Sequence, residues 1–338
     1  MDDACGGGRG LRATVTSELV DLLCDEWGLV PGRALRDLGG SANLNVLVGG
    51  KESQFVVRVY RPFITPGRLA GLQIARRTLA FHGLPVMEPI PTVGGRPWSH
   101  LGNRLVELEP FIPSTSPMKS IERVAAALPH LGRAHSALAD LRLGAEAVSS
   151  QFSNYVPQEE LPARVAVGTR RIRSWHPTAE ESRLADAADH MAEVLTQLQQ
   201  RSQDGAEVQL VHGDFWDNNV LFRDEEVVLI GDFDFMGERP RVDDLALTLY
   251  FVSQDIADLT EDPSALAALV DAYASRLDKP LSAAEREAIP IAMARQPLWS
   301  IAVWVALLDD EATARRHLAG TASALDWGVQ LTNSLLWR

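Results

Sequence analysis

A polar loop between two apolar stretches carries the side chains best suited to chemistry in this sequence. Asp214 lies near the start of the loop, Asn219 ends it, and Asp232 follows the next apolar stretch. One carboxylate can orient an alcohol and accept its proton, while a second carboxylate and an amide oxygen can hold Mg²⁺ against phosphate groups. Any one of these residues alone would more simply be a turn or cap residue. As an ordered set, they predict phosphoryl transfer from ATP, with Asp214 as catalytic base and Asn219 and Asp232 as metal ligands.

The same segment resembles the catalytic and metal-binding loops of eukaryotic-type kinases. With HGD at 212–214 and DFD at 232–234, the sequence is similar to the aminoglycoside phosphotransferase and choline kinase superfamily. The segment around Asp244, a buried Asp before Leu-Ala in that superfamily, fits as well. The resemblance implies an α+β, bilobal protein-kinase-like fold with a small β-rich N-lobe and a large helical C-lobe. It also implies ATP and Mg²⁺ as cofactors.

The nucleotide side of the site is predicted from two short stretches of the N-lobe. Residues 39–45 (GGSANLN) precede a predicted strand, where the related kinases carry their phosphate loop, so Ser41 and Asn43 are expected to contact phosphate oxygens. Arg58 stands where the family places a lysine that contacts the α- and β-phosphates, and it keeps the positive charge. A charge on a solvent-exposed strand face is the alternative. Gln73 stands where the family carries a glutamate partner for that cation, which leaves the ion pair open.

Acidic residues within and after the metal loops suggest the nature of the acceptor. They are Asp217, Asp234, Glu238 and Asp243. Two such carboxylates facing the cleft would favour a substrate that carries ammonium groups near its reactive hydroxyl. Trp216 would add an apolar or cation–π wall, with core packing as the equal alternative. We therefore predict an aminoglycoside or aminocyclitol acceptor, in contact with Trp216, Asp217 and Asp234.

Two other hypotheses remain open. Residues 40–45, 214–222 and 243–249 resemble the type II homoserine kinases, which would make the protein a small amino-alcohol kinase with Arg239 or Arg241 facing the substrate carboxylate. The other, from a different class, is a catalytically weak, nucleotide-binding pseudokinase, and it rests on Arg58 and Gln73. The presence together of the base and both metal ligands favours an enzyme.

The surrounding pattern predicts the elements that position these residues. We expect residues 1–11 to be disordered, 12–109 to form the nucleotide-binding N-lobe, and 110–338 to form the C-lobe with the catalytic loop, metal site and acceptor pocket. Expected N-lobe elements are a helix over 16–27, a hairpin over 42–50 and 54–61, a helix over 66–82, and strands near 86–93 and 104–108. Expected C-lobe helices cover 120–143, 178–203, 244–253, 263–277 and 282–308. His212 and His135 are predicted to be structural.

Composition limits the other possibilities. The 338 residues carry a net charge of −13, which argues against nucleic acid or an anionic membrane as a partner. The chain has two cysteines, in no arrangement that suits zinc or a disulfide framework. Its first residues show no signal-peptide pattern, and the longest apolar run, 298–308, is too short to span a bilayer. We therefore predict a cytoplasmic protein with a small-molecule partner, and leave the oligomeric state open.

Overall fold

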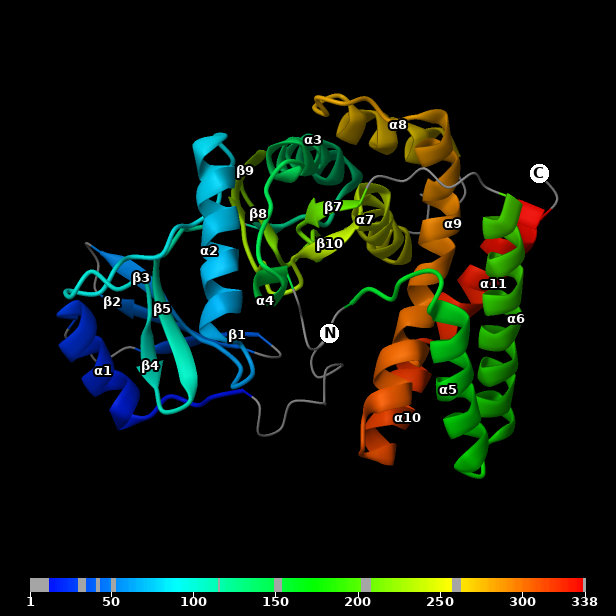
Figure 1. Cartoon of the computed structure of the whole chain (residues 1–338), viewed down its shortest axis with the longest axis horizontal. Helices are drawn as coiled ribbons and strands as arrows, with labels where there is room; N and C mark the ends of the chain where they lie inside the picture. The colour runs from blue at the N-terminus through cyan, green and yellow to red at the C-terminus, as the bar shows by residue number, and fades with distance from the viewer. Residues whose placement is uncertain are drawn as a thin grey trace.

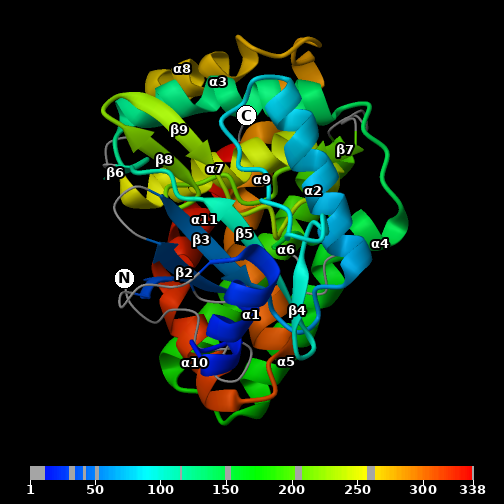
Figure 2. The same cartoon turned by 90° about the vertical axis from the view of Figure 1, so that its left-hand side faces the viewer.

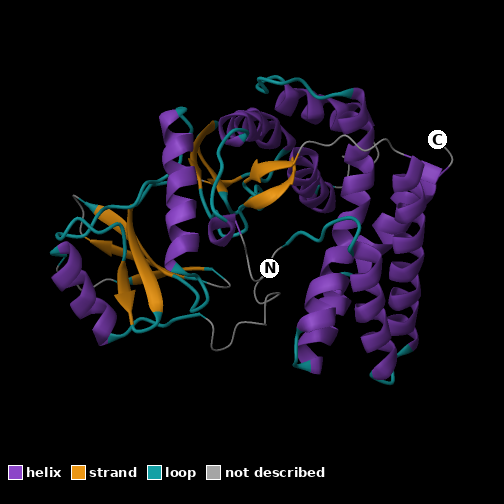
Figure 3. Ribbon diagram, in the orientation of Figure 1, coloured by secondary structure: helices purple, strands orange, loops and turns teal. Residues whose placement is uncertain are grey.

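The computed structural model describes residues 12–29, 35–40, 43–49, 53–114, 116–148, 154–201, 208–256 and 263–336. Strands gather in a small N-terminal lobe, and helices make up most of the remainder (Figures 1 and 3). This is the predicted α+β, bilobal arrangement. The stretch predicted to be disordered, 1–11, and the phosphate-loop residue Ser41 lie outside the described residues.

An antiparallel five-stranded sheet forms the N-terminal lobe, with the strand order β1-β2-β3-β5-β4. Its strands are β1 (Arg36–Gly39), β2 (Leu44–Gly49), β3 (Gln54–Val59), β4 (Ser99–Leu101) and β5 (Arg104–Pro110). Side chains alternate between the two faces of a strand. One face is apolar and packs against α1 (Ser17–Trp27), which Thr16 caps and which ends at Gly28. The other face carries charged residues and is covered by α2 (Pro66–Phe81).

The strand expected near residues 86–93 does not form. Val86 makes a single bridge to Ile230, and the chain continues as turns. Pro85, Pro89 and Pro91 explain the difference, because proline has no N–H to donate to a neighbouring strand.

Short strands at the boundary between the lobes carry the catalytic loop. They are β6 (Ser116–Pro117), β7 (Val208–Val211), β8 (Val220–Arg223), β9 (Glu226–Ile230) and β10 (Gly237–Pro240). β8 and β9 form a hairpin with β6 at the edge of β8, whereas β7 pairs with β10. In this hairpin Val220 pairs with Ile230, so Asn219 and Asp232 emerge at the same end.

Helices form the rest of the C-terminal lobe. They are α3 (Ile121–Leu138), α4 (Ala145–Val148), α5 (Leu161–Ser174), α6 (Ala179–Arg201), α7 (Arg241–Asp255), α8 (Pro263–Ala274), α9 (Ala283–Trp299), the π-helix η2 (Ser300–Val305), α10 (Glu311–Gly320) and α11 (Ala322–Leu336). The sequence pattern missed α4, α5, α10 and α11. Pro162 and Gly168 made α5 hard to predict, because both residues are unfavourable in helices. Gly168 is required there, because a Cβ would collide with the carbonyl oxygen of Ile301.

Among the residues that the structure places, apolar side chains form three clusters, one of which spans both lobes. One cluster lies between α1 and the five-stranded sheet, and a second lies inside the bundle of α5, α6, α9, α10 and α11. The largest joins Leu69, Leu72 and Leu79 of α2 to α3, α7 and the β8–β9 hairpin. Figure 1 shows α2 between the N-terminal sheet and the β8–β9 hairpin, and in Figure 2 one end of α2 lies near α3 and the other near α4. In the described part of the chain, no helix is both long and apolar enough to cross a membrane.

Candidate active site

The catalytic loop begins at a tight backbone approach. Gly213 has a φ of 84°, and a Cβ there would collide with the carbonyl oxygen of Phe235. Its N–H donates to Oδ1 of Asp244 at 3.0 Å, while Oδ2 of Asp244 contacts Nε2 of His135 at 3.0 Å. Burial opposes ionisation of Asp244, but the hydrogen bond from His135 keeps its pKa below the usual value. His135 is fully buried, as expected of a core histidine. The start of the loop is thus tied to α7 and α3.

His212 holds the loop to the strand that leads to Asp232. Its Nδ1 accepts a hydrogen bond from the N–H of Asp214 at 3.1 Å, so the ring proton lies on Nε2, which donates to the carbonyl of Gly231 at 3.0 Å. Burial lowers the pKa of His212 to about 4, and the ring is neutral near pH 7. These contacts are those of the loop-holding residue that the sequence predicted.

The three predicted chemical residues lie together at the end of the hairpin. Asn219 donates from Nδ2 to Oδ2 and to the backbone oxygen of Asp214, each at 2.8 Å. Gly231, just before Asp232, donates its N–H to the carbonyl of Asn219 at 2.8 Å. Burial, and then the charge of Asp232, raises the pKa of Asp214 well above its usual value. The structure therefore brings Asp214, Asn219 and Asp232 into one cluster.

Asp232 has an unusual backbone conformation. Its φ of 57° lies in the left-handed region, which costs a residue other than glycine on the order of 1 kcal/mol. Desolvation in the cleft, followed by the nearby Asp234 charge, raises the pKa of Asp232, yet 38% of its side chain stays exposed. Strain and crowded charge at one residue are typical of a functional site.

The donor set of this cluster suits a divalent cation. Among the residues that the structure describes, no group of three or more His, Cys, Asp or Glu side chains is arranged for a metal ion. Asp214 and Asp232 supply two carboxylates whose mutual repulsion raises the pKa of Asp214. Asn219 uses its NH₂ on Asp214, so Oδ1 is the atom it can offer a cation. Oxygen donors of this kind are those that Mg²⁺ prefers.

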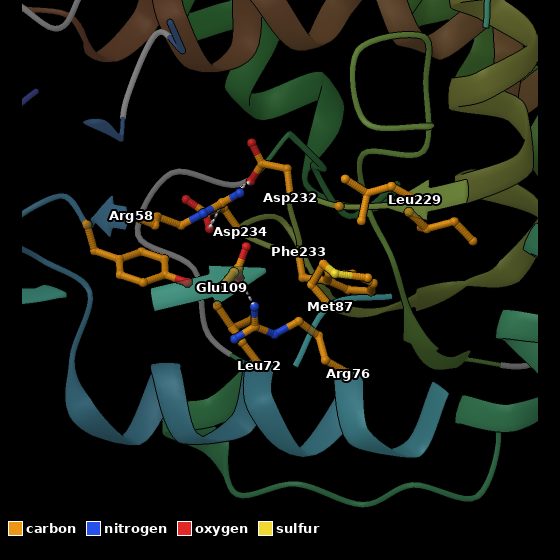
Figure 4. Close-up of a pocket in the computed structure, with 12 residues that line it drawn as sticks. Arg58, Leu72, Arg76, Met87, Glu109, Leu229, Asp232, Phe233 and Asp234 are labelled. Atoms are coloured by element: carbon orange, nitrogen blue, oxygen red, sulfur yellow. Dashed lines mark hydrogen bonds and ion pairs between the residues drawn. The ribbon is translucent and has the colours of Figure 1, made fainter. Parts of the chain in front are cut away.

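Arg58 faces the cluster, not solvent. It lies on β3 opposite Glu107, with 14% of its side chain exposed. Its Nη1 is 3.4 Å from Oδ1 of Asp232 and 3.9 Å from Oδ1 of Asp234, and Figure 4 shows the guanidinium pointing toward both carboxylates. Burial opposes the charge on Arg58, but Asp232 and then Glu109 hold its pKa well above the usual range. The alternative of a solvent-exposed strand charge is therefore excluded.

In the ion pairs between α2 and the sheet, the cation lies on the helix and the carboxylates lie on the strand. Gln73 of α2 donates to Oε1 of Glu107 at 2.6 Å and to the carbonyl of Pro97. Gln73 therefore binds the carboxylate of Glu107 and not the guanidinium of Arg58. Arg76 of α2 bridges Glu107 at 2.5 Å and also pairs with Glu109. Figure 4 shows Arg76 directed from the helix toward Glu109. The helix contributes the cation and the strand contributes the carboxylates.

Glu107 and Glu109 were missed as functional candidates. Both glutamates lie on β5, with exposed fractions of 0% and 8%. The alternation Glu-Leu-Glu was the available signal, because it sets both carboxylates on one face of a strand. Together with Arg58, Arg76, Asp232 and Asp234, Glu109 lines a pocket between α2, the sheet and the end of β9 (Figure 4).

Asn43 was predicted to contact the nucleotide phosphates and Asp234 the acceptor, and the two side chains contact each other. Nδ2 of Asn43 donates to Oδ2 of Asp234 at 2.6 Å, and Arg61 approaches the same oxygen at 3.3 Å. Arg68 of α2 donates to the backbone oxygens of Asp234 at 2.9 Å and of Met236 at 2.6 Å. Asp234 is thus paired with N-lobe side chains, and its predicted contact with an acceptor stays a prediction.

Trp216 and Asp217 lie at a small cavity on the other side of the catalytic loop. The rings of Trp216 and Phe251 are 4.8 Å apart, and both residues line the cavity together with Asp255. Asp217 is 7% exposed, and its Oδ2 lies 3.4 Å from Nζ of Lys119. Its Oδ1 is buried without a hydrogen-bond partner among the described residues. Burial raises the pKa of Asp217, although Lys119 opposes the shift.

Two of the other candidates, Asp243 and Arg241, have structural partners. Asp243 pairs with Arg295 of α9, and Arg241 binds Glu285 at 2.7 Å. Glu238 is exposed on β10. Arg241 is therefore engaged in joining α7 to α9, and it is not available to a substrate carboxylate.

Fold and site together define a small-molecule phosphotransferase of the protein-kinase-like class. The chain belongs to the phosphotransferase enzyme family, whose sequence profile matches residues 34–287. No curated protein sequence matches it. Family membership confirms the prediction of a small-molecule kinase enzyme.

Solved structures similar to this chain agree with the fold. A microcompartment-associated aminopropanol kinase has a TM-score of 0.70 at 16% identity, covering 96% of this chain and 99% of that one. An amicoumacin kinase has a TM-score of 0.68 at 14% identity, covering 93% of both chains. A spectinomycin phosphotransferase has a TM-score of 0.63 at 14% identity, covering 95% and 98%. These likenesses confirm the predicted kinase-like architecture.

Proposed function

We propose that this protein transfers the γ-phosphate of ATP, in the presence of Mg²⁺, to a hydroxyl of an amine-bearing small molecule. The observation that carries the proposal is the cluster of Asp214, Asn219 and Asp232 at one end of the β8–β9 hairpin, facing Arg58. The amicoumacin kinase was solved with AMP-PNP and Ca²⁺, and the spectinomycin phosphotransferase with AMP. Both support a nucleotide here, and the amicoumacin kinase also supports a divalent cation.

Each residue of the cluster has a role that follows from its chemistry. A bound Mg²⁺ would neutralise phosphate charge, with Asn219 and Asp232 as its protein ligands. Asp214 orients the acceptor hydroxyl and accepts its proton, helped by a raised pKa that makes the carboxylate a stronger base. Arg58 is poised to exchange Asp232 for the phosphate oxygens, which its guanidinium can bind in a bidentate manner.

An amine on the acceptor is supported by the cavity beside Trp216. The free Oδ1 of Asp217 is a buried anionic acceptor, and Trp216 and Phe251 give an aromatic wall that favours a cation. Asp217 follows Asp214 by three positions, which sets their Cα atoms about 11 Å apart at most. A sugar or cyclitol that carries both an amine and a hydroxyl fits this span. No described contact favours homoserine, because Arg241 is paired with Glu285 and Arg239 donates to Asn154 and to the carbonyl of Phe235.

The test is a panel of acceptors with and without Mg²⁺, measured by ATP consumption and by mass of the product. The panel should contain aminoglycosides, aminocyclitols, short amino alcohols and homoserine. Asp214→Ala should lower kcat by orders of magnitude with nucleotide affinity nearly unchanged. Turnover of homoserine without any aminoglycoside or aminocyclitol would contradict the acceptor class, and wild-type turnover by Asp214→Ala would contradict the catalytic role.

Two substitutions at the cavity should have different effects on KM for an amine-bearing acceptor. Asp217→Asn removes the buried carboxylate and should raise KM for an amine-bearing acceptor. Lys119→Ala removes the competing cation, whose side chain is 65% exposed, and should lower that KM or leave it unchanged. A rise in KM with both variants would indicate that the cavity is only a packing feature.

A further inference from the structure

Asn154 reaches the catalytic loop from the segment between α4 and α5. It is 8% exposed, and its Nδ2 donates to the carbonyl of Gly213 and to Oδ1 of Asp214, the latter at 3.4 Å. Asn219 donates to the other carboxylate oxygen, Oδ2, at 2.8 Å. Each oxygen of the Asp214 side chain thus accepts from a different side-chain amide.

Arg239 fixes which way the Asn154 amide points. Its Nη1 donates to Oδ1 of Asn154 at 3.1 Å. Because a guanidinium offers only donors, the oxygen of the amide must face Arg239 and the NH₂ must face Gly213 and Asp214. Arg239 is itself 3% exposed, donates from Nη2 to the carbonyl of Phe235 at 3.0 Å, and lies over the ring of Tyr155 at 4.8 Å.

We propose that Asn154 is a positioning residue for the phosphoryl transfer: held by Arg239, it fixes the carboxylate of Asp214 through Oδ1. The inference rests on the proposed function, in which Asp214 receives the proton of the acceptor. A carboxylate with one fixed oxygen can still rotate about its Cβ–Cγ bond, whereas a second donor sets its plane. A misplacement of about 1 Å at a reacting group can cost roughly 100-fold in rate, so the second donor matters to kcat.

The segment that carries Asn154 has a second anchor, which supplies a matched control. Oε1 of Gln158 accepts from Nη1 of Arg295 at 2.8 Å, and Arg295 pairs with Asp243. Gln158→Ala would loosen residues 154–158 at that anchor without removing a contact to Asp214. A purely structural role for the segment would therefore make this variant as damaging as a substitution of Asn154.

The experiment compares Asn154→Asp, Asn154→Ala and Gln158→Ala. Asn154→Asp keeps the size and the acceptor for Arg239 but removes the donor to Asp214. We expect kcat to fall about 10–100-fold in both Asn154 variants, with KM for ATP and the calorimetric affinity for ADP within threefold of wild type. Gln158→Ala should stay within threefold of wild type in kcat. In the Asp214→Asn background, Asn154→Asp should cause no further loss.

Several outcomes would overturn the inference. They are a normal kcat in Asn154→Ala, an equal loss of kcat in Gln158→Ala, or an additional loss in the Asp214→Asn background. If thermal unfolding shows that Asn154→Asp does not fold, Asn154→Ala replaces it in the experiment. If Asp214→Asn turns over like wild type, the proposed function fails and this inference falls with it. If Asp214→Asn is inactive while Asn154→Ala is normal, the inference alone fails.

Discussion

The two faces of the N-terminal sheet are built on opposite principles. Under α1 the sheet presents Val57 and Leu108, which are buried in an apolar cluster. Under α2 it presents Arg58 and Glu107, which are held among other charges, including Arg76. Burial of apolar side chains stabilises the fold but does not fix how each side chain is oriented. Buried ion pairs cost desolvation free energy and are retained where the orientation of a side chain matters. The first face therefore maintains the lobe, and the second directs Arg58 toward Asp232 and Asp234.

The largest effect is expected from breaking the charged face. Arg76→Met leaves Glu107 and Glu109 buried without their cation, which should lower the free energy of unfolding by about 3–5 kcal/mol. Chemical denaturation measures this loss. Adding Glu107→Gln and Glu109→Gln to the same chain should recover much of it, because the buried charges are then gone. A loss below about 1 kcal/mol in the single variant would mean that this face behaves like a solvated surface.

The next effect concerns pH and the catalytic loop, which the buried ring of His212 holds in place. The pKa of His212 is about 4 in the folded protein and about 6.5 when unfolded, so between these values the unfolded chain binds the additional proton. Stability therefore falls as the pH drops from 6.5 to 4, by about 3 kcal/mol from this residue. His212→Gln should show a correspondingly flatter pH dependence of unfolding. An unchanged slope would contradict a neutral, buried ring.

Arg58→Ala tests whether the charged face serves the nucleotide. A charge-assisted phosphate contact contributes about 1.5–3 kcal/mol, so KM for ATP should rise roughly 10–150-fold. Arg58→Lys should recover part of this if a point charge is sufficient. Unchanged ATP kinetics in Arg58→Ala would confine Arg58 to a structural pairing with Asp232.

Val57→Ala is the matched control on the opposite face. Val57 is the neighbour of Arg58 on β3 but points into the apolar cluster under α1. Removing about two buried methylene equivalents should cost about 2 kcal/mol of stability. Thermal unfolding would detect the loss, while KM for ATP should stay within twofold of wild type. A large change in KM would show that the two faces are not independent.

Much of the fold was predictable where short-range rules decide it. Thr16 and Gly28 mark the ends of α1, and apolar alternation marks β2 and β3, so these elements form where the pattern indicates. The cluster of Asp214, Asn219 and Asp232 was also accessible, because one hairpin register brings its members together.

The contacts that surround this cluster were not predictable from local pattern. Asn154 and Arg239 meet across 85 positions of sequence, and Arg76 and Glu107 across 31. No periodicity or spacing rule relates residues so far apart. The hydrogen bond from Asn43 to Asp234 was not predicted for the same reason, since it spans 191 positions.

The apolar cluster shared by α2 and the C-terminal lobe has a consequence for how the molecule opens. Leu69, Leu72 and Leu79 are buried against elements of the C-terminal lobe. Pulling α2 away with its sheet would expose them to water, at about 25 cal/mol for each Å² uncovered. We therefore expect the amide hydrogens of α2 to exchange with solvent at rates close to those of α3 and α7. The sheet edge at β1, all of whose residues are exposed, should exchange much faster.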